Sequence, residues 1–204
     1  TVQNVAAQNA GETAQGIGVF NGPFANGASG QLNLAIRNST VENITATDSN
    51  AIGIGVTTFN DDSSTAVQSH VDVVNTTIRG VSAANPSALA GGIANAVGGT
   101  TNGSSVGSTL SISNTIIAST NAACTTADIT SVIGGATGVT AANSITSGGG
   151  NITDDNTCAT YFTQASDQNN VGNLATTLGA LSNNGGFVPT IPLLANSLAV
   201  DGGI

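Results

Sequence analysis

Short runs of alternating apolar and polar residues recur along the chain, separated by turn-forming residues. The run at 32–36 reads Leu-Asn-Leu-Ala-Ile, and similar runs occupy 41–44 and 51–58. Alternation with a period of two places successive side chains on opposite faces of a β-strand. The pattern therefore predicts three strands in this part of the chain, joined by turns rich in Asn, Ser, Thr and Asp.

The same pattern returns after 37 and then 39 residues. Two sets of equivalent residues follow these steps: Asn38, Asn75 and Asn114, and Ile17, Ile54 and Ile93. Two registers with the same spacing indicate a structural repeat. Three strands and three bends in each coil of about 37–39 residues predict an all-β fold, a right-handed single-stranded parallel β-helix.

The recurring Asn falls at one bend of each coil. Asn tolerates the left-handed backbone conformation that such bends use. If the coils stack, Asn38, Asn75 and Asn114 are expected to form a ladder of amide hydrogen bonds along the axis. The alternative is that each Asn serves only its own turn.

Composition supports a solenoid and excludes several kinds of partner. Only 6% of the 204 residues are charged, while 39% are hydrophobic, so the chain can bury apolar side chains and is not expected to be disordered. A net charge of −9, with two Arg and no Lys, disfavours binding to nucleic acid or anionic lipid. No apolar run reaches the roughly 18 residues of a membrane-spanning helix.

Cys124 and Cys158 are the only cysteines. An even pair in a chain of this composition suggests one disulfide and an oxidising compartment, outside the cell or at its surface. Two buried free thiols are the alternative.

The chain divides near residue 120. Residues 1–119 carry the coils and begin in the middle of one, because Thr1–Ala7 aligns with Thr40–Ala46. Residues 120–204 are expected to form the last coil and a C-terminal cap, in which Leu193, Leu194, Leu198 and Val200 plug the open core. The first coil has no visible cap, which predicts self-association through the ends of the β-helix. We interpret the N-terminus as processed.

The last third contains a distinctive series of motifs. Gly148-Gly-Gly-Asn-Ile lies between the two cysteines, and Leu178-Gly-Ala-Leu-Ser-Asn-Asn-Gly-Gly-Phe-Val-Pro-Thr follows them. The chain then continues with Leu193-Leu and with Ser197-Leu-Ala-Val-Asp-Gly-Gly. Over residues 110–203 this resembles the choice-of-anchor Q domain of bacterial cell-surface parallel β-helix proteins. The resemblance implies a closing module of a β-helix, export, and a Cys124–Cys158 disulfide, and it supplies no catalytic residue.

Catalytic and cofactor motifs are not found in the sequence. Parallel β-helices often act on polysaccharides, but no triplet of carboxylates recurs at strand spacing, and His70 is the only histidine. Arg37 and Arg79 occupy nearby positions in successive repeats and are expected on one face. The pairs Asp61-Asp62 and Asp154-Asp155 are candidates for calcium, although their spacing matches no calcium-repeat motif.

The sequence therefore predicts a non-enzymatic, secreted or cell-surface structural or adhesive module, which could assemble end to end into fibres or matrix. The candidate partners are further copies of the chain, surface glycans, and host or matrix proteins. The alternative function is binding or degradation of a polysaccharide.

Overall fold

The computed structural model describes residues 1–9, 11–22, 29–118, 120–128 and 136–204. These residues form strands and one short 3-10 helix. In chain order the elements are β1 (Val2–Ala7), β2 (Ala14–Asn21), β3 (Gly30–Arg37), β4 (Thr40–Ala46), β5 (Ala51–Asn60), β6 (Ala66–Val74), β7 (Thr77–Ala83), β8 (Ala90–Gly99), β9 (Ser105–Ser113), β10 (Ile116–Ala118), β11 (Ala122–Asp128), β12 (Thr140–Gly149), β13 (Ile152–Thr153) and the helix η1 (Leu174–Thr177).

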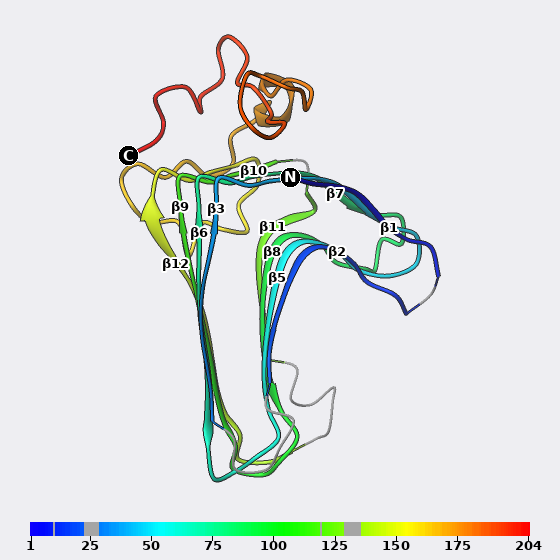
Figure 1. The fold of residues 1–204 in the computed structure, drawn as a ribbon, viewed down its shortest axis with the longest axis vertical. Helices are drawn as coiled ribbons and strands as arrows, with labels where there is room; N and C mark the ends of the chain where they lie inside the picture. The colour runs from blue at the N-terminus through cyan, green and yellow to red at the C-terminus, as the bar shows by residue number, and fades with distance from the viewer. Residues whose placement is uncertain (10, 23–28, 119, 129–135) are drawn as a thin grey trace.

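The strands form three parallel sheets, each taking one strand from every coil. Sheet A has the order β1-β4-β7-β10-β13, sheet B the order β11-β8-β5-β2, and sheet C the order β12-β9-β6-β3. In Figure 1 the strands of each sheet overlie one another; sheet A crosses the top, and sheets B and C run downward and converge. The predicted parallel β-helix with three strands per coil is confirmed.

Equivalent residues lie directly over one another. Ile17 pairs with Ile54, Ile54 with Ile93, and Ile93 with Cys124, so one column continues through all four coils of sheet B. The predicted register is therefore confirmed for the first three coils. The last coil is shorter than its predecessors, because Gly91 of β8 already pairs with Ala122 of β11.

A column of glycines lies in sheet B where it packs against sheet A. Gly16, Gly53 and Gly92 occupy equivalent positions in β2, β5 and β8, and none of them has a positive φ. A Cβ atom on Gly53 would lie 2.6 Å from Cγ2 of Ile78 and 2.6 Å from the carbonyl oxygen of Gly92. The glycines therefore leave the space that the large aliphatic side chains of sheet A occupy.

Sheets B and C enclose a polar seam that the repeat pattern did not predict. Asn95 occupies the position that Val56 holds in the preceding coil, and both residues are buried. Its side chain donates to the carbonyl oxygens of Ser108 and Ser144 (3.2 and 2.9 Å) and accepts from the Ser108 hydroxyl (2.6 Å). These bonds satisfy a polar group that would otherwise be costly to bury.

An end segment, residues 154–170, covers the last coil. Cys158 and Phe162 are buried in the same core cluster as Cys124 and Ile145, which belong to the last strands of sheets B and C. Asp155 Oδ2 accepts from the backbone N–H of Ala123 (2.8 Å). The edge of β11 is thus partly paired by side chains instead of by another strand.

The prediction that the leucines of the C-terminus plug the core is wrong. Leu193 and Leu194 are 39% and 43% exposed, Leu198 and Val200 are 57% and 50% exposed, and none belongs to the core cluster. Cys158 and Phe162 of the end segment cover this end of the core instead, since both are buried in the cluster that contains Cys124.

The remaining residues, 171–204, form what we call the strap, which lies on the outer face of sheet A (Figure 1). Leu174, Leu178 and Ile191 of the strap pack against Ala118 and Ile152 of sheet A.

Polar contacts tie the strap to the first three coils of the stack. Thr1 of the first coil donates through Oγ1 to the carbonyl oxygen of Pro189 in the strap (2.9 Å). Asn114 of the third coil accepts through its amide oxygen from the backbone N–H of Ile204 (2.9 Å). Arg79, which is also ion-paired with Glu42, donates to the carbonyl oxygen of Gly179 (2.6 Å). The strap therefore connects successive coils along the axis.

Candidate functional site

The outer face of sheet C presents two columns of mostly polar residues, which we call the polar face. One column is Asn33, His70, Thr109 and Ser144; the other is Ala35, Asp72, Ser111 and Thr146. Neighbouring members of a column are about 4.8 Å apart, because they lie on adjacent strands. The alternation of the strands turns these residues outward and Val71, Leu110 and Ile145 inward.

A charged cluster lies at the first two coils of the polar face. His70 Nε2 is 3.2 Å from Asp72 Oδ1, and Arg37 Nη2 is 3.7 Å from Asp72 Oδ2. The side chains of Arg37, His70 and Asp72 are 55%, 46% and 35% exposed. Because the cluster is open to water, its ion pairs contribute little to stability, and all three groups remain accessible to a ligand.

Hydroxyl groups continue the polar face over the last two coils. Ser111 and Thr146 are joined by a hydrogen bond of 3.3 Å, and Ser144 donates to Thr109 Oγ1 at 3.4 Å. Each hydroxyl can still donate or accept toward a ligand. The result is a flat array of neutral groups beside the charged cluster.

The charged cluster is a poor fit to the chemistry of glycoside hydrolysis. That reaction uses two carboxyl groups on either side of the bond that is cleaved. In the described part of the chain, Asp72 is the single carboxylate paired with His70 and Arg37. The prediction that Arg37 and Arg79 share a face is wrong, because Arg37 ends β3 in sheet C whereas Arg79 lies on β7 in sheet A. The two residues are 42 positions apart, which exceeds the 37-residue step: Arg37 pairs with Val74 in sheet C, and Arg79 pairs with Glu42 in sheet A.

The calcium candidates lie in two separate turns. Asp61 and Asp62 follow β5, where the Asp62 carboxylate accepts from Ser64 N–H (2.7 Å). Asp154 and Asp155 follow β13, where Asp155 accepts from Thr157 and Ala123. Within the described ranges, no group of three or more His, Cys, Asp or Glu side chains could hold a metal ion.

The recurring Asn residues adopt the left-handed conformation expected of them. Asn38, Asn75 and Asn114 have φ of 50°, 51° and 49°, and Asn75 Nδ2 donates to Asn38 Oδ1 (3.2 Å). The Asn114 amide instead bonds Ile204 of the strap, at 3.3 Å as donor and 2.9 Å as acceptor. The ladder thus joins the first two Asn residues, and the third Asn holds the end of the strap.

A second Asn ladder runs along sheet A. Asn4 and Asn43 also have positive φ (57° and 58°), and Asn43 Nδ2 donates to Asn4 Oδ1 (2.6 Å). Gly80 takes the equivalent position in the next coil, with φ of 68°. The alignment of Thr1–Ala7 with Thr40–Ala46 contained the signal for this ladder, since both segments carry Asn at the same place.

Cys124 and Cys158 form a disulfide with a Cα–Cα distance of 5.0 Å. Cys124 takes the place of Ile93 in the next coil, so the disulfide joins a core column to the end segment. The bond therefore fixes the end segment to the last coil.

Comparison with protein-family models, with curated proteins and with solved structures found no match to this chain. The resemblance to the choice-of-anchor Q domain therefore rests on the motifs between residues 110 and 203 alone. None of the described segments forms a helix of the length and apolarity needed to span a membrane.

Proposed function

We propose that the chain is a non-catalytic structural and adhesive module of the cell surface or extracellular space, and that it contacts glycans through the polar face. The observation that carries this proposal is the pair of outward columns that starts at Asn33 and Ala35. Neutral glycans present many hydroxyl groups, which can pair with hydroxyl, amide and imidazole groups that donate and accept hydrogen bonds.

The shape of the polar face suits an extended partner. The columns cross four parallel strands, so equivalent groups repeat along the coil axis at the strand spacing. The outer face of sheet A is less open, because the strap packs on part of it. The disulfide supports a location in an oxidising compartment, where such bonds persist.

A discrete module fits the structure better than a fibre built end to end. Among the described residues, β1, β2 and β3 stand at one edge of sheets A, B and C. At the other end, however, Asp155 and Thr157 accept from the N–H groups of Ala123 and Cys124. A head-to-tail contact would have to displace these side chains.

The test measures binding of the oxidised protein to immobilised neutral and acidic polysaccharides. We expect the double variant Asn33→Ala, Thr146→Ala to lose most of the binding, because both side chains are exposed on the polar face. The matched control is Thr47→Ala, Ser87→Ala, two exposed polar residues in turns outside sheet C. Full binding by the polar-face variant, or equal loss in both double variants, would overturn the proposal.

The same samples test the alternative of polysaccharide degradation. Formation of new reducing ends or unsaturated sugars, abolished by His70→Ala, would replace the adhesive proposal with an enzymatic one. That alternative is favoured only by the contact of His70 with Asp72.

A further inference from the structure

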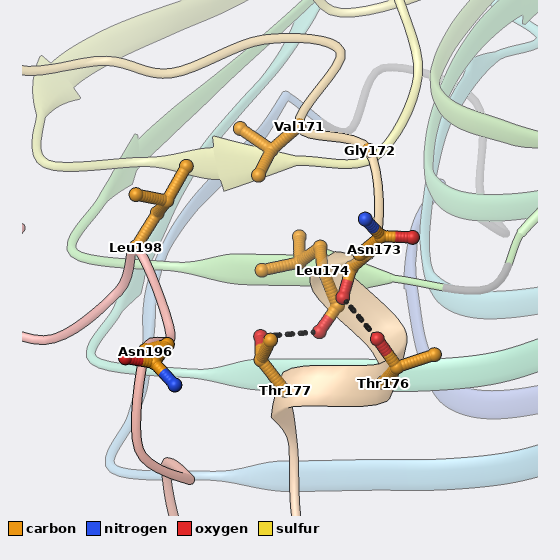
Figure 2. A pocket seen from close by; sticks show the side chains of 8 residues that line it. All are labelled: Val171, Gly172, Asn173, Leu174, Thr176, Thr177, Asn196 and Leu198. Atoms are coloured by element: carbon orange, nitrogen blue, oxygen red, sulfur yellow. Dashed lines mark hydrogen bonds between the residues drawn. The ribbon is translucent and has the colours of Figure 1, made fainter.

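A pocket of about 340 Å3 lies between η1 and the last part of the strap. Its lining residues all belong to the strap, on the outer face of sheet A, and none belongs to the polar face. Figure 2 shows Asn196 and Leu198 on one side and the residues of η1 on the other. The residues that shape it include Val171, Asn173, Leu174, Thr177, Asn196 and Leu198. Its volume is within the range of small-molecule sites in proteins.

The pocket combines two kinds of surface. Leu198 is 57% exposed and Val171 is half-buried, so these two side chains give the pocket its accessible apolar surface, while Leu174 is buried. Asn173 and Asn196 add two carboxamides, and the Asn173 side chain makes no capping hydrogen bond to η1. Each carboxamide offers a donor and an acceptor side by side. None of the described residues that line the pocket is charged.

Hydrogen bonds hold the two walls of the pocket in place. Thr177 Oγ1 donates to the carbonyl oxygen of Leu174 (2.9 Å) and lies 3.2 Å from Ser197 Oγ, so it joins η1 to the opposite wall. Leu194 N–H donates to the Thr177 carbonyl oxygen (2.9 Å). A pocket with fixed walls needs little ordering when a ligand enters, which favours binding.

Both asparagines have a left-handed backbone, with φ of 67° at Asn173 and 68° at Asn196. A non-glycine residue in this conformation is uncommon, and Asn is the type that accepts it best. Glycine would adopt the same backbone without strain. The turns therefore explain why Asn or Gly stands at each position, but not why both side chains border one pocket.

We propose that this pocket binds a single uncharged monosaccharide unit. Adjacent hydroxyl groups of a sugar ring can pair with the donor and acceptor of one carboxamide, and the C–H face of the ring can lie on Val171 and Leu198. The absence of lining charges disfavours sugar acids, phosphates and amines. This site is independent of the polar face, and either one can exist without the other.

The experiment titrates the isotope-labelled oxidised protein with glucose, galactose, N-acetylglucosamine and, as the charged comparison, glucuronate, and follows backbone amide signals by NMR. We expect at least one neutral sugar to shift the signals of residues 171–177 and 196–198 in a saturable manner. A disaccharide that ends in the same unit is added to distinguish a free sugar from the end of a longer glycan. Equal or tighter binding of the disaccharide indicates a chain end, and binding of the monosaccharide alone indicates a free sugar; both outcomes support the pocket.

Glycine variants separate the role of the carboxamides from that of the backbone. Asn173→Gly and Asn196→Gly should each weaken binding about fivefold, the loss of roughly one neutral hydrogen bond. Asn170→Gly is the control, because Asn170 also has a positive φ (58°) but does not line the pocket. Tighter binding of glucuronate, no saturable shift with any neutral sugar, or equal weakening by Asn170→Gly would overturn the proposal. The outcome of the polysaccharide-binding test on the polar-face variant does not affect the proposal for the pocket, because the two sites share no residue.

Discussion

The substitution Gly53→Ala tests the glycine column between sheets A and B. The new Cβ would approach both the Ile78 side chain and the Gly92 carbonyl oxygen to 2.6 Å, a distance that requires atoms to move. The Gly92 oxygen belongs to the backbone of the next coil and cannot move without disturbing the sheet. Overpacking of this kind costs about 1–3 kcal/mol.

The same substitution also has a stabilising effect on the free energy of unfolding, and a control variant must share that effect. Replacing Gly by Ala reduces the entropy of the unfolded chain and stabilises by about 0.4–1 kcal/mol where the backbone permits Ala. Gly55→Ala is the matched control, since Gly55 lies two residues later in β5 and also lacks a positive φ. Its Cβ would meet the end of the Gln15 side chain, which is flexible and can rotate away.

The assay is urea unfolding of the oxidised proteins, followed by circular dichroism. We expect Gly53→Ala to unfold with a free energy about 1–3 kcal/mol lower than Gly55→Ala, because the unfolded-state term is common to both variants. Equal free energies of unfolding for the two variants would refute the claim that the walls converge at Gly53.

Four further predictions concern other contacts. Reducing the Cys124–Cys158 bond, which closes 34 positions, should lower the free energy of unfolding by about 3–4 kcal/mol, measured in urea with and without reductant. Asn75→Ala should destabilise more than Asn75→Gly, by about 1–2 kcal/mol, since Ala resists a positive φ; thermal unfolding of both variants checks this. Asn95→Val should cost about 1–3 kcal/mol by leaving buried partners unpaired, and its urea midpoint should fall. Arg79→Ala should release the strap, so limited proteolysis should cleave within 171–204 sooner than in the unaltered protein.

The coils could be predicted from sequence because each coil needs the same kinds of residue at the same positions. Ile17, Ile54 and Ile93 occupy one column, and selection for packing leaves the same residue type at each level. Departures from the repeat were less predictable. Asn95 interrupts a column that Val56 begins, and its partners come from sheet C, so alignment within one sheet does not reveal them.

The segment after β13 could not be predicted in the same way, since it does not continue the repeat. Leu193 and Leu194 looked like core residues by composition, yet the core at that end was already filled by Cys158 and Phe162. Which apolar residue reaches the core depends on the path of the chain, and that path has no periodic signal. The pocket at Asn173 likewise depends on two segments whose approach no spacing indicates.

The strap has a consequence for how the molecule comes apart. Solenoids hold each coil only by its neighbours, and they are prone to fray one layer at a time from a terminus. Here the Thr1 hydroxyl and the Asn114 amide bond to the same strap, at Pro189 and Ile204. Peeling of the first coil must therefore pull on the same strap that is bonded to the third coil. We expect amide hydrogen exchange to show one shared opening event across the layers, with protection that does not decline steadily toward the ends.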